Sequence, residues 1–162
     1  MPSNTQFARR AVLGAILAVG VSTSSIATVA GHHVGDTRWG TPGDPSMVTR
    51  TVRIVATEIK FDVTHLTFRT GETIRFVFVN KGEQPHEFMI ADAAEQAEHR
   101  KLMAKMTGMS MPGGHDERNL VDAKPGETKE LVWRFSKKGR FQFACNYIGH
   151  AEVGMLGTID VR

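Results

Sequence analysis

The amino-acid sequence predicts an all-β domain, a β-sandwich or barrel, with one short helical insert. From residue 51 onward, short runs alternate polar and apolar residues, which is typical of half-buried β-strands. Turns that contain Gly or Pro separate these runs. One stretch, residues 93–107, has the composition of a helix instead. About seven short strands joined by turns indicate a sandwich or a barrel.

Four strands are expected in the first half of the domain. Residues 51–56 and 64–68 alternate between polar and apolar side chains. A turn at 70–72 leads into a strongly apolar strand at 73–79. Residues 86–90 form the fourth strand, after a turn that contains Gly and Pro.

The helical insert is predicted at residues 93–107. Glu95 lies early in this stretch and Lys105 lies late, which complements the helix dipole. Residues three and four positions apart share one helix face, here His99, Leu102, Met103 and Met106. We expect this face to cover the sandwich.

Three more strands are expected after the insert. Residues 128–135 alternate and follow a Pro-Gly turn at 124–127. Residues 140–144 follow a turn at Gly139 and lead directly to the single cysteine of the chain. The last strand, within residues 155–161, closes the domain.

Residues 1–30 have the pattern of a signal peptide. Arg9 and Arg10 precede an apolar run at 11–21, and small residues follow up to Ala30. The pattern predicts export to the periplasm by the Sec route or the twin-arginine route. An uncleaved membrane anchor is the alternative, although the run is short for a bilayer span. After cleavage we expect no stable membrane insertion.

The charge and cysteine content exclude two further classes. The formal net charge is +3, and it falls to +1 without residues 1–30, because that segment carries two arginines and no acids. No stripe of basic residues with interleaved aromatics is present, so the sequence gives no sign of nucleic-acid binding. A single cysteine excludes an intrachain disulfide.

The segment after the cysteine carries metal-binding side chains at regular spacing. Cys145, His150 and Met155 follow one another at steps of five, and His86 is the obvious second histidine. Two His and one Cys in a plane, with a weak axial Met, are typical of a mononuclear electron-transfer copper site. The alternative is a buried cysteine and a core methionine without metal.

Copper suits this set of residues because sulfur ligands favour Cu(I) and imidazole tolerates both oxidation states. Apolar neighbours are expected to exclude water, namely Phe141, Phe143, Tyr147, Ile148 and Leu156. Turn glycines are expected to fold the loop back on itself, namely Gly149, Gly154 and Gly157.

These motifs resemble those of the cupredoxins, small blue-copper proteins, over about residues 50–162. The matching positions are Asn80, the pair Pro85–His86, Phe141, Phe143, Cys145, His150, Met155 and Gly157. The resemblance implies a Greek-key β-sandwich. It also implies that His86, Cys145 and His150 are equatorial copper ligands and that Met155 is axial.

A narrower resemblance is to the periplasmic copper-tolerance cupredoxins of the CopI type. The leader, a His-bearing arm and the Met/His-rich insert carry this resemblance. One position departs from the pattern of many electron carriers of this fold, which have Asn or Ser after the first His ligand, where this chain has Glu87. Since neighbouring hydrogen bonds tune metal sites, a distorted, greener copper site is our hypothesis.

The insert at 93–115 is a candidate for further copper binding. Thioethers bind Cu(I) without losing a proton, and four of the eight methionines lie close together there. The candidate ligands are Met106, Met109, Met111, His99 and His115. Packing against the sandwich is the alternative, chiefly for Met103 and Met106.

The segment 31–48, rich in Gly, Pro and His, is expected to be a flexible arm before a domain at 49–162. If cleavage follows Ala30, the arm begins with Gly31, His32 and His33. An N-terminal amine, two amides and the third-residue imidazole form a square-planar set suited to Cu(II) or Ni(II). A solvated arm with incidental histidines is the alternative.

The sequence predicts a periplasmic copper-binding protein that acts in copper tolerance, by binding and, as a further hypothesis, oxidising copper. A dedicated electron carrier between periplasmic redox partners is the alternative. In either case a redox or copper-handling protein is the expected partner. One metal site filled by four protein ligands leaves no position for a substrate, so we expect no enzymatic activity.

Overall fold

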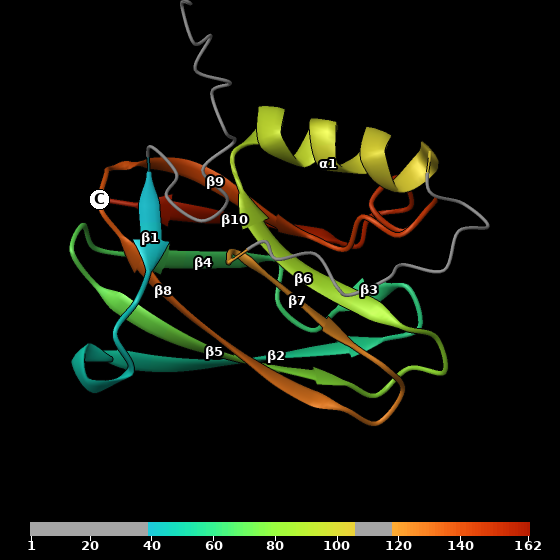
Figure 1. The fold of residues 1–162 in the computed structure, drawn as a ribbon, viewed down its shortest axis with the longest axis horizontal. Helices are drawn as coiled ribbons and strands as arrows, with labels where there is room; N and C mark the ends of the chain where they lie inside the picture. The colour runs from blue at the N-terminus through green and yellow to red at the C-terminus, as the bar shows by residue number, and fades with distance from the viewer. Residues whose placement is uncertain (1–38, 106–117) are drawn as a thin grey trace, which may run out of the picture. The chain divides into compact units, whose positions relative to one another are not determined.

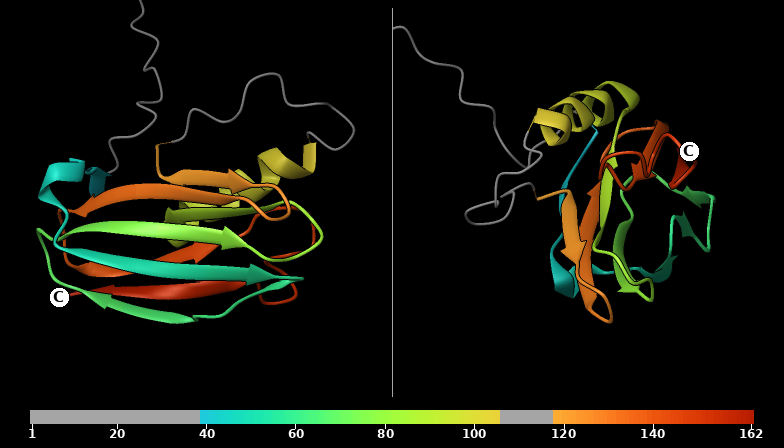
Figure 2. Two further views of the ribbon diagram at one scale, coloured as in Figure 1. Left: turned by 90° about the horizontal axis from the view of Figure 1, so that it is seen from below. Right: turned by 90° about the vertical axis from the view of Figure 1, so that its right-hand side faces the viewer.

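Two five-stranded β-sheets pack on each other in the computed structural model, which describes residues 39–105 and 118–162 (Figure 1). In the left-hand view of Figure 2, β8, β5 and β2 of the first sheet lie side by side. The strands of this sheet, in spatial order, are β1 (Gly40–Pro42), β8 (Thr128–Phe135), β5 (Thr73–Asn80), β2 (Arg50–Thr57) and β3 (Lys60–Phe61).

The second sheet contains the strands that lead to the cysteine. Its strands, in spatial order, are β4 (His65–Phe68), β10 (Leu156–Val161), β9 (Gly139–Ala144), β6 (His86–Ala91) and β7 (Leu120–Ala123). The chain passes from one sheet to the other between β5 and β6 and again between β7 and β8. Several strands that are neighbours within a sheet are therefore distant in the sequence. The expected all-β Greek-key sandwich is confirmed.

Aromatic rings fill the space between the sheets. Phe88 of one sheet stacks on Phe78 of the other, with ring centroids 5.7 Å apart, and Phe68 stacks on Phe135 at 5.2 Å. The largest fully buried side chains are Trp133, Phe68, Phe76, Phe78, Phe88, Phe135, Phe143, Ile54, Ile74, Met89, Ile90 and Met155. This core holds both sheets rigidly, and the strand ends are therefore fixed relative to one another.

The structure corrects the expected boundary of the arm. Gly40–Pro42 forms a strand that pairs with β8, and Trp39 is buried against Trp133 with ring centroids 5.0 Å apart. Pro45–Met47 forms a short 3₁₀ helix, capped by the side chain of Asp44. The sequence missed β1 because its three residues include Gly and Pro, which are typical of turns. Residues 31–38 lie outside the described residues.

The insert forms helix α1 at Ala93–Lys105, which lies along β6 and β9 (Figure 1). Asp92 begins it, because its carboxylate accepts hydrogen bonds from the backbone N–H groups of Ala94 and Glu95. The predicted helix is confirmed as far as residue 105. Within the described ranges, no helix is long and apolar enough to cross a bilayer.

The buried face of α1 differs from the expected one. Its buried side chains are Gln96 and His99, whereas Leu102 is 42% exposed. The face expected from spacing is correct for His99, which is buried, and in part for Met103, which is half-buried, but wrong for Leu102. The side chains that dock the helix form hydrogen bonds instead of apolar contacts. Met106 lies outside the described residues.

Candidate metal centre

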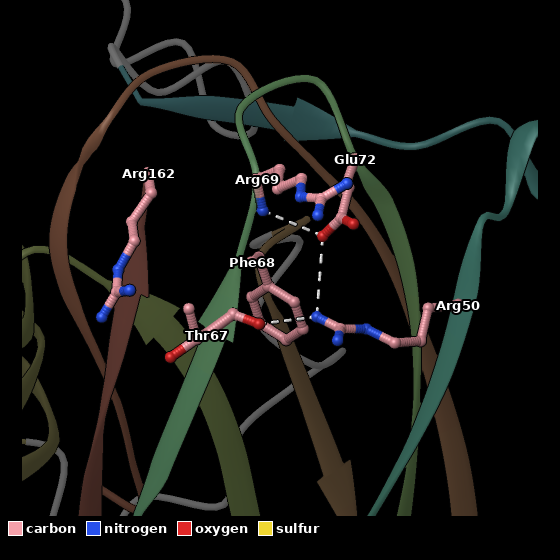
Figure 3. A pocket seen from close by; sticks show the side chains of 6 residues that line it. All are labelled: Arg50, Thr67, Phe68, Arg69, Glu72 and Arg162. Carbon is pink, nitrogen blue, oxygen red and sulfur yellow. Dashed lines mark hydrogen bonds and ion pairs between the residues drawn. The ribbon is translucent and has the colours of Figure 1, made fainter.

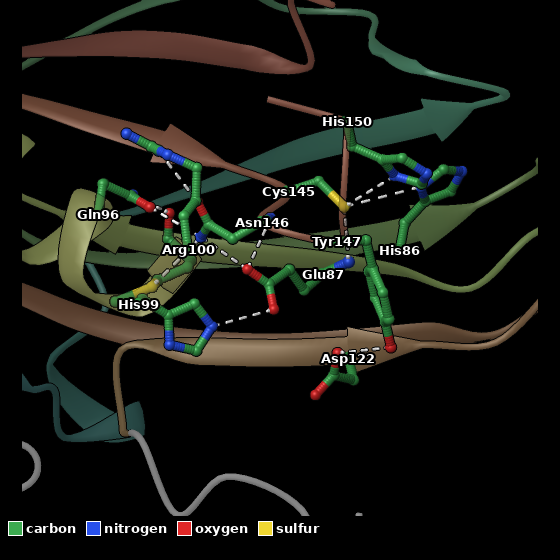
Figure 4. Close-up of polar contacts among 11 residues, drawn as sticks. His86, Glu87, Gln96, His99, Arg100, Asp122, Cys145, Asn146, Tyr147 and His150 are labelled. Carbon is green, nitrogen blue, oxygen red and sulfur yellow. Dashed lines mark hydrogen bonds and ion pairs between the residues drawn. The ribbon is translucent and has the colours of Figure 1, made fainter. Parts of the chain in front are cut away.

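Three metal-binding side chains meet at one end of the sandwich. Cys145 Sγ lies 3.3 Å from His150 Nδ1 and 3.8 Å from His86 Nδ1 (Figure 4). The donor atoms of all three residues lie within 4.8 Å of one another. His86 and Cys145 are fully buried, and His150 is 7% exposed, so it is the member nearest to solvent.

Strand order explains why these residues meet. β9 lies between β10 and β6 and ends at Ala144, so Cys145 emerges between its two neighbouring strands. β6 begins at His86 in the antiparallel direction, and Met155 immediately precedes β10. Residues nearly 60 positions apart in sequence are therefore brought to one edge of the sheet.

Met155 is fully buried, and its backbone is fixed to the other members of the site. Its carbonyl accepts a hydrogen bond from the Cys145 N–H at 3.1 Å, and its N–H donates to the His150 carbonyl at 2.9 Å. The loop from 145 to 155 is thus closed at its base, which holds the thiol and the thioether on the same short segment.

Burial controls the protonation of the three donors. It raises the pKa of the Cys145 thiol from 9.0 to about 12, against a weaker opposing effect of the Glu87 N–H, which donates to Sγ at 3.4 Å. Burial also lowers the pKa values of His86 and His150, so both imidazoles are neutral at pH 7. The thiolate needs a nearby cation, while the imidazole lone pairs are free to bind one.

This donor set fits copper. One thiol and two imidazoles converge at a buried position, and the fully buried Met155 lies on the same loop as Cys145 and His150. His86, Cys145 and His150 would hold the ion, and Met155 is the candidate fourth ligand. When bound, copper would supply one-electron redox chemistry between Cu(I) and Cu(II).

Two of the three expected turn glycines have the predicted role. Gly149 and Gly154 have φ values of 85° and 105°, which L-residues with side chains rarely adopt. Gly157 does not, because it lies inside β10, where a Cβ would meet the Phe143 ring at 2.1 Å. The third expectation was therefore wrong, and Gly157 is needed for close packing.

Asn80 fixes the turn that precedes His86. Its side-chain Nδ2 donates to the carbonyls of Gln84 and Ala123 at 2.7 and 2.9 Å, and its Oδ1 accepts from the Gly82 N–H at 2.8 Å. Asn80 is fully buried, and its bonds to Ala123 and Gly82 are shielded from water. The turn therefore delivers His86 in one position.

Glu87 binds the residue that follows the cysteine (Figure 4). Its Oε1 accepts hydrogen bonds from the backbone N–H and from the Nδ2 of Asn146, at 2.8 and 2.7 Å. Both residues are buried. The position that departs from the family pattern thus ties the two ligand segments together through its own side chain.

Helix α1 adds three polar side chains to this pair. Asn146 Nδ2 donates to Gln96 Oε1 at 2.9 Å, Arg100 Nη1 donates to Asn146 Oδ1 at 3.2 Å, and His99 Nε2 lies 3.3 Å from Glu87 Oε2. We call these residues the helix–loop network, namely Glu87, Gln96, His99, Arg100 and Asn146. The role of this network was not predicted from the sequence, although the polar residues 96, 99 and 100 share a helix face.

The remaining candidate ligands are distributed as follows. His99 is 4% exposed and contacts Glu87, so it belongs to the helix–loop network. His65, expected to be a strand residue, lies in β4, and its Nδ1 hydrogen-bonds Thr158 Oγ1 at 2.9 Å. The other candidates lie outside the described residues, namely His32, His33, Met106, Met109, Met111 and His115.

Of the apolar side chains expected to exclude water, Phe141 and Phe143 are buried, whereas Leu156 and Ile148 are 37% and 60% exposed. Tyr147 is partly buried against the core, and its hydroxyl donates to Asp122 Oδ1 at 3.4 Å. Val153 is 67% exposed, so two exposed apolar side chains, Ile148 and Val153, lie on the loop that carries His150.

A second concavity, of about 500 Å³, lies among the ends of β4 and β10 and the starts of β2 and β5 (Figure 3). Arg50 is fixed there, because it donates to the Thr67 carbonyl at 2.7 Å and stacks over Phe68 at 4.5 Å. Arg69 and Arg162 also line it, with Glu72 as its one acidic side chain. Three guanidinium groups make this concavity unsuitable for a metal cation.

Comparisons with known proteins agree with this geometry. Residues 48–162 match the family model of copper-binding proteins of the plastocyanin/azurin family. The copper-resistant cuproprotein CopI of Rubrivivax gelatinosus is 40% identical, over 80% of this chain and 77% of that protein. CopI of Pseudomonas aeruginosa is 32% identical, over 96% of this chain and 99% of that protein.

A solved structure supports the fold separately. Auracyanin B has a TM-score of 0.62 at 20% identity, and the match covers 76% of this chain and 96% of that one. At this identity the likeness concerns the fold alone.

Proposed function

The chain belongs to the plastocyanin/azurin family of copper-binding proteins, and we propose that it is a periplasmic copper-tolerance protein with one mononuclear copper centre. The observation that carries this proposal is the buried convergence of His86 Nδ1, Cys145 Sγ and His150 Nδ1 within 4.8 Å. With Met155 these residues are the proposed ligands. The similarity to two CopI proteins supports the role in copper tolerance.

The proposed location is the periplasm. It is supported by the basic, apolar and small-residue pattern of residues 1–30. A free buried thiol also fits an oxidising compartment only when it is protected, and metal binding protects it. The pattern of residues 1–30 is compatible with export by either the Sec route or the twin-arginine route.

Copper tolerance would gain from binding at further sites. Met106, Met109, Met111 and His115 in the insert, and His32 and His33 in the arm, remain proposed auxiliary ligands. Their chemistry supports binding of Cu(I) by thioethers and of Cu(II) by the arm. His99 is removed from this set, because its Nε2 already contacts the Glu87 carboxylate.

Electron transfer to a redox protein is the second candidate function. The exposed Ile148 and Val153 beside His150 favour it, because an apolar surface next to a metal ligand suits brief docking of a partner. The two functions are compatible, since a centre that accepts electrons can oxidise Cu(I). Intrinsic catalysis on an organic substrate is not part of the proposal, because four protein ligands fill the site.

The test is a copper titration of the exported protein, with visible absorption and metal-to-protein stoichiometry, beside Cys145→Ser. Intense thiolate-to-copper absorption that is lost in the variant would support the centre. More than one copper per chain, reduced by Met109→Leu with Met111→Leu, would support tolerance through auxiliary sites. Absence of the absorption in the wild-type protein would contradict the proposed centre.

A further inference from the structure

We propose that helix α1 positions the copper centre, with Gln96 and His99 as positioning residues that hold the cysteine segment against β6. This inference rests on the proposed function. The first observation behind it is a contact between Glu87 and Cys145 within the site. The Glu87 N–H donates to Cys145 Sγ at 3.4 Å, and the Glu87 side chain binds the next residue, Asn146. Glu87 therefore holds the sulfur and the backbone that carries it.

The second observation is that every polar atom of the Asn146 side chain has a hydrogen-bond partner. Its backbone N–H and Nδ2 both donate to Glu87, Nδ2 also donates to Gln96 Oε1, and Oδ1 accepts from Arg100. A side chain bound on every polar atom has one available rotamer. Because Asn146 directly follows Cys145, the same bonds hold the backbone that carries the thiol.

The third observation is burial. Glu87 and Gln96 are fully buried, Asn146 is 1% exposed and His99 is 4% exposed. Water therefore cannot replace a bond that is lost, and each missing partner leaves a buried polar group unpaired. This explains why the buried face of α1 is polar. Gln96 is also fixed at its other end, since its Nε2 donates to the Met89 carbonyl at 3.0 Å.

The consequence concerns the two oxidation states of copper. A centre that changes oxidation state with little rearrangement needs ligands held in place by the residues around them. The loop of Cys145 is held by the helix from one side and by its own closure at Met155 from the other. Loss of the helix contacts should loosen the thiolate without removing any ligand.

The experiment compares three variants and a control. His99→Leu and Gln96→Leu each remove bonds of the helix–loop network, and His99→Gln keeps a donor toward Glu87. Glu98→Gln is the control on the same helix, because Glu98 pairs with Lys101 at the surface and its side chain is 73% exposed. Each protein is examined metal-free by amide hydrogen exchange, and loaded with Cu(II) by visible absorption, electron paramagnetic resonance and midpoint potential.

In the metal-free protein, exchange of the Asn146 amide should accelerate about ten- to a hundredfold in His99→Leu and Gln96→Leu. In the Cu(II) form, the copper hyperfine splitting and the ratio of the absorption bands should change in both variants. His99→Gln should restore the wild-type values, and Glu98→Gln should not depart from them.

Two results would overturn the inference. One is unchanged Asn146 exchange in both leucine variants. The other is faster exchange with unchanged spectra and potential, which would show that the network stabilises the fold without positioning the centre. If His99→Leu does not fold, Gln96→Leu decides alone. Failure of the proposed function appears separately, as absent thiolate-to-copper absorption in the wild-type protein.

Discussion

A single carboxylate oxygen, Oε1 of Glu87, accepts hydrogen bonds from both the backbone N–H and the side-chain Nδ2 of Asn146, at 2.8 and 2.7 Å. Many cupredoxin electron carriers have Asn or Ser at the position of Glu87. Here the longer side chain reaches Asn146 with one oxygen and His99 with the other. The ligand segments around His86 and Cys145 are thus joined by a buried acid.

Replacing Glu87 should lower the stability of the metal-free protein. Glu87→Ala removes the acceptor of the buried Asn146 N–H and one of the acceptors of its Nδ2, and it leaves His99 without its carboxylate partner. We expect a loss of about 3–5 kcal/mol in the free energy of unfolding. Glu87→Gln keeps one acceptor oxygen and should lose less. Chemical denaturation of the metal-free proteins measures both changes.

Glu130→Ala is the control for this prediction. Glu130 pairs with Arg75 on the surface, where its side chain is 56% exposed, so the expected loss is below about 1 kcal/mol. Equal losses for Glu87→Ala and Glu130→Ala would show that the buried bonds contribute little.

Copper binding should release one proton from the protein. The Cys145 thiol, with its pKa raised to about 12, is protonated at pH 7–9 in the metal-free protein and must ionise to bind. His86 and His150 release none in this range, because burial lowers their pKa values and they are already neutral. Affinity should therefore rise about tenfold per pH unit. Titration calorimetry in two buffers of different ionisation enthalpy counts the protons.

The same thiol should reduce the stability of the metal-free protein at alkaline pH. Below pH 9 it is protonated in both states, so its contribution is constant. Between pH 9 and about 12 it ionises only when unfolded, and stability should fall by about 1.4 kcal/mol per pH unit. Burial also raises the pKa of Tyr147, which adds a similar slope above pH 10.

The Cys145→Ser variant separates the contribution of the Cys145 thiol from that of Tyr147. Serine does not titrate in this range, so the difference in slope between wild-type and variant belongs to the thiol, and Tyr147 contributes equally to both. Parallel curves of unfolding free energy against pH would show that the Cys145 thiol is not shielded from water in solution.

Three of the four proposed ligands could be predicted from sequence because their chemistry is local. Cys145, His150 and Met155 lie on one loop, and the residue types themselves indicate copper. The long strands could be predicted for a similar reason, since alternation along 128–135 corresponds directly to the alternating burial of β8. Both patterns are contained within a single segment.

The sequence predictions that were wrong concern contacts between segments that are distant in the sequence. The buried face of α1 depends on Glu87 and Asn146, which are 12 and 46 or more positions away from their helix partners. Hydrophobic spacing predicts apolar docking and therefore cannot predict a helix held by hydrogen bonds. The strand β1 depends likewise on pairing with β8 and on burial of Trp39.

Gly157 is a third such case, and it yields the last prediction. Its position inside β10 places a substituted Cβ 2.1 Å from Cζ of the fully buried Phe143 ring. Gly157→Ala should therefore cost about 1–3 kcal/mol of unfolding free energy, because the ring must move in a closely packed core. Thermal and denaturant unfolding measure this loss. Gly149→Ala is the comparison, since nothing lies within 4 Å there and only the positive φ opposes the side chain.

A double-mutant cycle distinguishes the clash with Phe143 from a loss of stability that any replacement of this glycine in β10 would cause. Phe143→Leu shortens the side chain that Gly157→Ala would contact, so the double variant should lose less than the sum of the two single losses. The Gly149→Ala variant combined with Phe143→Leu should show additive losses, because the two positions do not touch through the added Cβ. Additive losses for Gly157→Ala with Phe143→Leu would mean that the cost lies in the backbone of β10 rather than in its packing.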